Sequence, residues 1–352
     1  LPPILPAFVG LGTGEFLCFM LFWALNLWIV LRGMNSIKLL ETWGSPFLLV
    51  VGFALLAWAW TRAGGLGAML ENPAGTTGDR SGVGAVFGAG LTSAVAFWGT
   101  MALSIPDFSR FARSQKDQVV GQTVGLPAAM ALFAFVGAAV TNATSVIYGS
   151  RIADPVTLLA RIGGPAMIIL SMVGLAVATL TTNIAANVVA PANGFSNLAP
   201  QRISFRAGAM ITAVIGILML PWRLYNDAAA YIFTWLIGYG ALLGPVAGIL
   251  LADYFVLRRQ QLNVSDLYRR GGQYEYANGV NWVAVLALVL GVLPNLPGFL
   301  GALGVVRPSP LATAVYNSAW FVGFGVAFGA YLVGMRMFAP ASSSSKAAYA
   351  GE

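Results

Sequence analysis

Residues 164–190 read GPAMIILSMVGLAVATLTTNIAANVVA, and this stretch decides the fold class. It contains no charged side chain and exceeds the about 20 mostly apolar residues that a helix needs to cross a bilayer. Other long apolar runs follow one another along the chain. A transmembrane β-barrel would instead show alternating strands of about ten residues. The sequence therefore predicts an all-α integral membrane protein.

The composition of the whole chain supports this prediction. Of its 352 residues, 58% are hydrophobic and 9% are charged, whereas charged residues make up about 25% of an ordinary soluble domain. Histidine is absent and Cys18 is the single cysteine, so the chain lacks both the usual base at neutral pH and a thiolate metal cluster. We therefore expect neither an enzyme nor a cofactor.

The apolar runs are separated by charged residues, by proline or by glycine clusters. Because a Lys or Arg at the centre of a bilayer costs about 2.5 to 3.5 kcal/mol, the charged stretches are expected in the connections. About nine transmembrane helices are predicted, at residues 14–31, 44–61, 84–104, 119–142, 164–190, 206–222, 228–256, 281–298 and 311–335.

The basic residues predict the orientation of these helices. The net charge is +7, but the 19 Lys and Arg residues are scattered among the connections instead of forming a stripe for nucleic acid. One set of alternate connections carries most of them, so that set and the C-terminus are predicted to be cytoplasmic. The chain starts at Leu1 without a signal peptide, and we read it as part of a longer protein.

Residues 97–107 (FWGTMALSIPD) form the first unusual stretch inside a predicted span. Glycine lowers helix stability by about 1 kcal/mol and proline by about 3 kcal/mol, so a break is expected near Gly99. Transporters place substrate sites at such breaks, and Trp98 would lay its ring against a planar ligand there. The spacing alone favours a simpler interpretation, in which Trp98 is a packing or interfacial tryptophan.

The most polar stretch inside any span is residues 178–187 (ATLTTNIAAN). At about 100° per residue, Ala178, Thr181 and Thr182 share one face, while Asn183 and Asn187 share another. Two hydroxyls and a backbone carbonyl form an uncharged oxygen set that suits an alkali ion, and an asparagine amide complements an imide or amide edge. Hydrogen bonding between helices explains the same residues equally well.

Two acidic residues lie near the predicted inner ends of spans. Asp253 is followed by Arg258 and Arg259, and Asp107 is followed by Arg110. In both places we expect a local ion pair or a helix-end anchor, so no acidic residue is predicted to carry a proton.

Three motifs in this order resemble the nucleobase:cation symporter-1 family, which includes hydantoin, uracil, allantoin and cytosine permeases. They are LSIPDFSRF at 103–111, TTNIAAN at 181–187, and ADY at 252–254 followed by DLY at 266–268 and GVN at 279–281. The resemblance implies a leucine-transporter-like fold of twelve helices, built from two inverted repeats of five plus two more. The nine helices here would then be the fourth to the twelfth.

The same resemblance implies a division of the chain. Residues 1–82 would end the first inverted repeat, and residues 83–256 would form the second. Residues 257–338 would hold a cytoplasmic loop and the two additional helices, and residues 339–352 would be a disordered tail.

The resemblance also implies the site residues. Phe97 is bulkier than the glycine that the hydantoin carrier has at this place, which weakens a hydantoin assignment. The implied substrate-binding residues are Trp98, Phe97, Gly99, Asn187 and Asn183. The implied sodium ligands are the carbonyl oxygen of Ala178 and the hydroxyls of Thr181 and Thr182.

These inferences predict a symporter of the plasma membrane that imports a nucleobase or a related planar heterocycle together with a cation by alternating access. The candidate substrates are uracil, allantoin, a hydantoin, cytosine or a purine, and the expected partners are this substrate, the cation and the lipid bilayer. An amino-acid or amine symporter of the same fold is an alternative, although no charged residue adjoins Trp98 or Asn187. A channel or a membrane-embedded enzyme is disfavoured, because the sequence shows neither a repeated filter nor a cluster of acids or histidines. A fragment without the first three helices would be inactive by itself.

Overall fold

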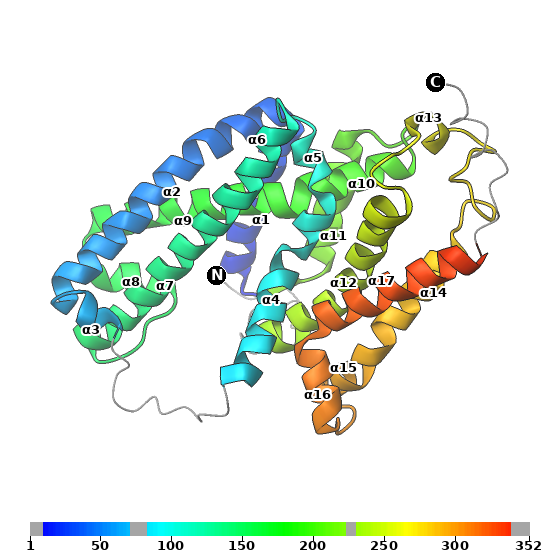
Figure 1. The fold of residues 1–352 in the computed structure, drawn as a ribbon. Helices are drawn as coiled ribbons and strands as arrows, with labels where there is room; N and C mark the ends of the chain where they lie inside the picture. Colours follow the sequence, from blue (N-terminus) through cyan, green and yellow to red (C-terminus); the bar gives the residue numbers. More distant parts are fainter. Residues whose placement is uncertain (1–9, 71–82, 223–229, 339–352) are drawn as a thin grey trace. The chain divides into compact units, whose positions relative to one another are not determined.

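The structure is a computed structural model that describes residues 10–70, 83–222 and 230–338 (Figure 1). The described residues form helices joined by loops, with one isolated β-bridge between Ala277 and Val280. Seven of the described helices are long and apolar enough to cross a membrane. The prediction of an all-α membrane protein is therefore confirmed. The tail predicted at 339–352 lies outside the described residues.

The chain divides into two compact units, and the first contains the described residues of 1–79 and 104–223. Its longest helices are α2, α7 and α9, and α2 packs against both of the others. The elements of this unit are α1 (Thr13–Leu31), α2 (Met34–Ala63), α3 (Leu66–Leu70), α5 (Pro106–Ser109), α6 (Gln115–Val120), η2 (Gly121–Gly125), α7 (Leu126–Tyr148), α8 (Pro155–Ile162), α9 (Pro165–Asn183), η3 (Ile184–Val189), α10 (Ala190–Leu198) and α11 (Phe205–Leu218).

The second unit contains the described residues of 80–103 and 224–352. Helices α12, α14 and α17 pack side by side in it (Figure 1). The elements of this unit are α4 (Val83–Ser104), η5 (Ala230–Leu236), α12 (Ile237–Leu251), η6 (Ala252–Leu257), α13 (Val264–Leu267), α14 (Trp282–Val292), η7 (Leu293–Asn295), α15 (Leu296–Ala302), α16 (Pro310–Asn317) and α17 (Ala319–Phe338). Contacts do not test the division into inverted repeats, which stays a prediction.

Each of the nine predicted spans overlaps helix in the part of the chain that the structure describes. Two of them are not among the seven long apolar helices: these are α4 and α11, and α11 has only 14 residues. The largest difference concerns α2, which begins at Met34 and not at residue 44 as predicted. Its first turns contain Lys38 and Glu41, and from the sequence alone these charges predict a loop between two helices. The helix accommodates Lys38 because a long side chain can keep its ammonium near the surface.

The first unit is held together at a close approach of α2 to α9. A Cβ atom added to Gly44 would lie 2.7 Å from Cγ2 of Thr181. Ile37, which precedes Gly44 by about two helical turns, is buried in a cluster with Leu180 and Ile184. The glycine therefore lets α2 pack directly against the polar stretch of α9.

The second unit is held together along a row of glycines on α12. Gly240, Gly244 and Gly248 recur every fourth residue and so share one face of the helix. A Cβ on Gly244 would lie 2.4 Å from the carbonyl oxygen of Trp320, and one on Gly248 would lie 2.5 Å from that of Phe324. The backbones of α12 and α17 are therefore in contact at Gly244 and Gly248, whereas a Cβ on Gly240 would lie 3.0 Å from Cβ of Ala96 on α4. We call this row the glycine seam. Small residues allow such close packing between membrane helices.

Helix α4 belongs to the second unit although it precedes the rest of it in sequence by more than a hundred residues. The hydroxyl of Thr92, which is fully buried, donates a hydrogen bond of 2.7 Å to the carbonyl oxygen of Asn317 at the end of α16. One of the polar groups inside a predicted span is therefore satisfied by a distant part of the chain.

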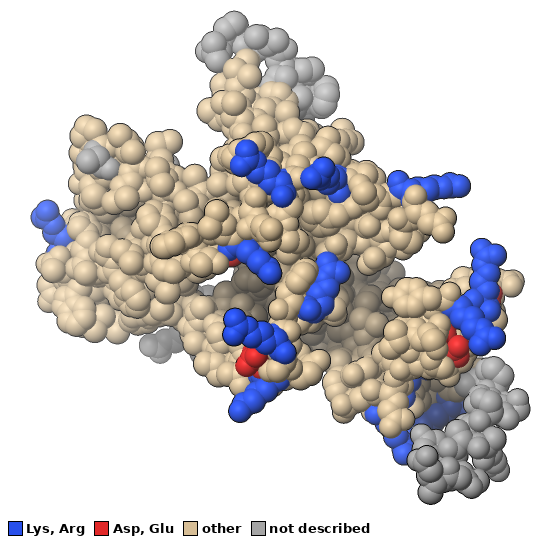
Figure 2. Space-filling model, turned by 90° about the horizontal axis from the view of Figure 1, so that it is seen from above, with Lys and Arg blue, Asp and Glu red and all other residues tan. Residues whose placement is uncertain are grey.

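Charged side chains are sparse on the molecular surface. Figure 2 shows one face, on which the Lys and Arg side chains lie singly or in small groups, some of them beside Asp or Glu, among residues of other kinds. The basic residues on this face form no continuous patch of the kind that binds nucleic acid.

Candidate functional site

The stretch around Trp98 lies in a continuous helix. Helix α4 runs unbroken from Val83 to Ser104, so the predicted break near Gly99 is wrong. A Cβ on Gly99 would lie 2.7 Å from the Trp320 ring and 3.1 Å from Leu243. The glycine is needed for close packing within the second unit and not for unwinding the helix.

Trp98 keeps an unused hydrogen-bond donor inside this packing. Its indole Nε1 is buried and has no hydrogen-bond partner among the described residues. The ring of Phe97 meets it edge to face, with centroids 5.5 Å apart and an interplanar angle of 77°. Phe97 itself is 48% exposed. A buried indole N–H usually finds a hydrogen-bond partner, so packing alone does not account for this donor. A substrate role for Trp98 stays a prediction.

The two asparagines of the first unit belong to a chain of amide hydrogen bonds. Asn187 donates from Nδ2 to Oδ1 of Asn183 at 3.0 Å, and Asn183 donates from Nδ2 to Oδ1 of Asn26 at 3.0 Å. Asn26 in turn donates to the carbonyl oxygen of Phe22 at 2.8 Å. The chain orients Asn187, which is exposed at its end, and leaves Oδ1 of Asn187 without a donor in the part of the chain that the structure describes.

Asn26 is not predicted from the sequence, because a lone asparagine in an apolar run carries no motif. It is buried, with 6% of its surface exposed. Its part in the amide chain depends on the packing of α1 against η3, which the sequence does not reveal.

Asn187 lies on a π-helical turn, η3, directly after α9. The cause of this π-helical turn is visible in the sequence, because Pro191 follows Asn187 by four residues. Proline has no N–H, and its ring clashes with the carbonyl four residues before it, which is that of Asn187. A wider turn relieves this clash, and such turns occur frequently at functional sites.

The predicted sodium ligands lie near one another on α9 but differ in exposure. The hydroxyl of Thr181 lies 3.0 Å from the carbonyl oxygens of both Val177 and Ala178. Thr181 is 6% exposed, whereas Thr182 is exposed. These oxygens carry no formal charge, and the described residues contain no cluster of acids, cysteines or histidines for a divalent metal. The donor set therefore fits an alkali ion.

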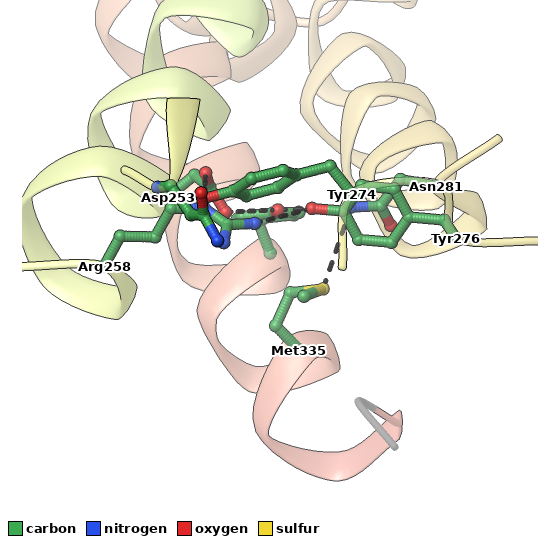
Figure 3. A network of polar contacts seen from close by, with 8 residues as sticks. Asp253, Arg258, Tyr274, Tyr276, Asn281 and Met335 are labelled. Atoms are coloured by element: carbon green, nitrogen blue, oxygen red, sulfur yellow. Dashed lines mark hydrogen bonds and ion pairs between the residues drawn. The ribbon is translucent and has the colours of Figure 1, made fainter. Parts of the chain in front are cut away.

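Asp253 forms the ion pair that was predicted for it. Its Oδ2 accepts a hydrogen bond of 2.6 Å from Nε of Arg258. Its Oδ1 accepts one of 2.8 Å from the hydroxyl of Tyr331 on α17, and Asn281 donates to that hydroxyl at 3.2 Å (Figure 3). The carboxylate is thus satisfied on both oxygens, as expected of an anchor.

Arg258 extends this network into the loop before α14. It donates to the hydroxyl of Tyr276 at 2.7 Å, and its guanidinium lies 4.4 Å from the ring centre of Tyr274 (Figure 3). Burial alone would lower the pKa of Arg258, but its hydrogen bond and charge interaction with Asp253 raise that pKa overall. The network ties this loop to η6, to the start of α14 and to α17.

The ion pair expected between Asp107 and Arg110 is absent. The guanidinium of Arg110 lies 5.1 Å from the ring centre of Phe111 instead, and the Asp253–Arg258 pair is the one salt bridge among the described residues. Partial burial raises the pKa of Asp107, and the charge of Arg110 opposes this rise only in part. Arg110 therefore lies by an aromatic ring and forms no salt bridge with Asp107.

The fold and these polar positions define a multi-pass α-helical membrane protein with uncharged polar side chains inside its spans. Residues 2–323 match the family described as permease for cytosine/purines, uracil, thiamine, allantoin. The chain belongs to this family, which confirms the resemblance seen in its motifs.

Two curated relatives show the extent of the match. The chain is 47% identical to the purine-uracil permease NCS1 of Arabidopsis thaliana over 339 residues, which cover 95% of this chain and 56% of the relative. It is 41% identical to the allantoin permease of Bacillus subtilis over 335 residues, which cover 95% of this chain and 66% of the relative. The chain thus spans between about half and two thirds of the length of these relatives.

A solved structure shows the same fold. It is that of Mhp1, a nucleobase-cation-symport-1 family transporter, in a closed conformation with bromovinylhydantoin bound. The TM-score is 0.68 at 25% identity, over 93% of this chain and 68% of that chain. The expected transporter fold is therefore confirmed.

Proposed function

We propose that this protein is an ion-coupled symporter that imports a nucleobase or a related planar heterocycle. The observation that carries the proposal is the chain of three amides that ends at Asn187. Such a chain fixes the orientation of one exposed amide inside an otherwise apolar span, as recognition of a polar ligand edge requires. The names of the relatives, a purine-uracil and an allantoin permease, support the same substrate class.

The substrate is recognised by stacking and by hydrogen bonds. Asn187 uses one N–H for Asn183 and keeps a second N–H and its carbonyl oxygen, which complement the C=O and N–H of an imide or amide edge. Trp98 contributes a ring face to a flat ligand, and the neighbouring Phe97 and Gly99 shape its surroundings. An amine or amino acid would need an opposite charge, and residues 95–101 and 181–190 contain none.

Sodium is the proposed coupling ion, held by the carbonyl oxygen of Ala178 and the hydroxyls of Thr181 and Thr182. One charge moving through 100 mV supplies about 2.3 kcal/mol, which allows about fiftyfold accumulation of a neutral solute. Alternating access of one substrate site supplies the path. The protein would work in the plasma membrane with its C-terminus in the cytoplasm, as the distribution of basic residues indicates.

The test of the function is uptake of radiolabelled uracil, allantoin and a hydantoin into proteoliposomes that contain the full-length protein, with and without an inward sodium gradient. We expect saturable uptake of at least one substrate that the gradient stimulates. Thr182→Ala should raise the sodium concentration for half-maximal uptake at least tenfold, because it removes an ion ligand. Thr179→Ala is the matched control, because Thr179 is exposed on the same helix and donates to Leu175. Uptake of none of the three substrates would contradict the proposal.

Three substitutions along the amide chain are expected to weaken substrate binding to different degrees. Asn187→Ala should weaken binding by about five- to 150-fold, since a polar group of the bound substrate that loses its hydrogen-bond partner costs about 1 to 3 kcal/mol. Asn183→Ala and Asn26→Ala should have smaller effects, because they loosen Asn187 without removing it. Equilibrium binding of radiolabelled substrate to purified protein measures all three. Asn142→Ala on α7 is the control, and losses that were equal for Asn26 and Asn187 would contradict direct contact by Asn187.

A further inference from the structure

A groove of about 630 Å³ lies in the first unit, between the end of α1, the first half of α2 and the middle of α9. Its lining is apolar except for Arg32 and Ser36, which both lie where α1 passes into α2. Several of the apolar lining residues are exposed, namely Trp28, Leu39, Trp43 and Val173. The groove therefore has one polar end and a long apolar wall.

The helices beside the groove fix its depth in a bilayer. Arg32 and Gly33 form the whole connection between α1 and α2, which are both long and apolar enough to span the membrane. The 30 residues of α2 are about 45 Å long at 1.5 Å per residue, which matches a bilayer of about 40 to 45 Å with its headgroups. Arg32 then lies at the level of the headgroups. Phe47, at the other end of the groove, lies about 20 Å deeper, in the hydrocarbon.

The polar end offers a positive charge to an anion. The guanidinium of Arg32 lies 3.9 Å from the ring centre of Trp28, and it forms no salt bridge in the part of the chain that the structure describes. An arginine that stacks on an aromatic ring keeps its N–H groups at the edge of the guanidinium plane, in the fork that fits phosphate oxygens. Ser36 adds a hydroxyl to the same end, and no Asp or Glu is among the described residues that line the groove.

We propose that this groove binds one anionic phospholipid. The phosphate would lie on Arg32 and Ser36, and one acyl chain would extend along Leu39, Trp43 and Phe47 into the hydrocarbon. The proposed orientation places the groove in the cytoplasmic leaflet, where anionic lipids give the surface a negative potential. The site is separate from the proposed substrate site, so it does not depend on which molecule the protein transports.

The shape of the groove favours a phospholipid over other occupants. A free anion would use the polar end and leave the apolar wall uncovered. An apolar protein helix would cover the wall but would bring no negative charge to Arg32. A phospholipid supplies both parts in one molecule, with the charge at the headgroup level and the chain below it. The groove also includes Gly44, where α2 approaches Thr181 on α9, so the bound chain should stabilise this contact.

The test measures lipid binding to the purified full-length protein by native mass spectrometry, with phosphatidylglycerol and phosphatidylcholine of the same acyl chains as probes. The wild type should bind phosphatidylglycerol more tightly. Arg32→Gln should weaken phosphatidylglycerol binding about fivefold, as expected for one cation near an anionic headgroup, and leave phosphatidylcholine binding unchanged. The matched control is Arg62→Gln, an exposed arginine at the other end of α2, which should bind both lipids like the wild type.

A second pair of variants tests the apolar wall. Val173→Trp would fill the groove with an indole and should weaken binding of both lipids severalfold. Met172→Trp adds the same ring at a neighbouring residue of α9 that is 65% exposed and does not line the groove, and it should bind both lipids normally. Excess inorganic phosphate should not displace the lipid, because it cannot replace the acyl chain.

The thermal unfolding midpoint gives an independent readout, since a ligand that binds the folded state raises it. Phosphatidylglycerol should raise the midpoint of the wild type and of Arg62→Gln more than that of Arg32→Gln. Equal affinity of the wild type for the two lipids, or equal losses in Arg32→Gln and Arg62→Gln, would overturn the proposal. So would a wild type that retains no lipid, which would show that protein covers the groove. If Arg32→Gln does not fold, unchanged phosphatidylglycerol binding by Val173→Trp overturns the proposal by itself.

Discussion

Replacing Trp98 by alanine is expected to weaken substrate binding strongly and to lower uptake accordingly. Stacking of a base on an aromatic side chain is worth about 1 to 3 kcal/mol by alanine substitution, which corresponds to about a five- to 150-fold weaker affinity. The loss of the unpartnered buried Nε1 donor adds to this if that group bonds the ligand. Titration of purified protein with radiolabelled uracil and allantoin measures the change in affinity directly.

Two variants separate stacking from general damage. Trp98→Phe keeps a ring and loses the donor, so its affinity should lie between those of the wild type and the alanine variant. Trp60→Ala removes a tryptophan that is 50% exposed on α2 and should bind normally. Normal binding by Trp98→Ala would remove this residue from the substrate site.

Replacing Gly244 by alanine should destabilise the second unit strongly. The added Cβ would lie 2.4 Å from the carbonyl oxygen of Trp320. This oxygen belongs to the backbone of α17, which cannot move away by rotating about a side-chain bond. Overpacking costs about 1 to 3 kcal/mol and sometimes more, so the thermal unfolding midpoint in detergent should fall by several degrees. The effect should exceed that of a change on the exposed side of α12.

Gly325→Ala on α17 is the matched control for the glycine seam. No described atom lies within 4 Å of the Cβ that it would add. Alanine is favoured over glycine in a helix by about 1 kcal/mol, so this change should leave the midpoint unchanged or raise it. A fall of equal size for both variants would show that the seam is not closely packed.

The sequence is sufficient to predict the helices and the family, because both depend on long apolar runs and on short motifs. It misplaces the start of α2, since Lys38 and Glu41 suggest a loop, and Glu41 is therefore not recognised as a residue inside a span. Gly99 has the sequence context of a helix breaker. In the structure, the missing side chain of Gly99 makes room for the ring of Trp320. The sequence alone does not distinguish a glycine that breaks a helix from one that allows close packing, because it does not reveal the packing partner.

The candidate site can be predicted in part. Trp98, Asn183 and Asn187 stand out as polar or aromatic residues in unusual stretches, and the motifs imply their roles. Asn26 cannot be found in this way, because it becomes significant only through its hydrogen bond to Asn183. The π-helical turn at Asn187 does have a signal, Pro191, which is informative once the clash with the carbonyl of residue 187 is considered.

The hydrogen bond between Thr92 and Asn317 joins residues that are 225 positions apart in sequence. Ribosomes add about 5 to 20 residues per second, so about 10 to 45 s separate the synthesis of the donor from that of its acceptor. During this interval α4 already exists while α16 and α17 do not. The hydroxyl of Thr92 and the open surface at Gly99 must then be covered by lipid, by the insertion machinery or by temporary neighbours. Biogenesis of the second unit is therefore completed only by the end of the chain, and a ribosome that stalls before α16 leaves a helix without its native partner.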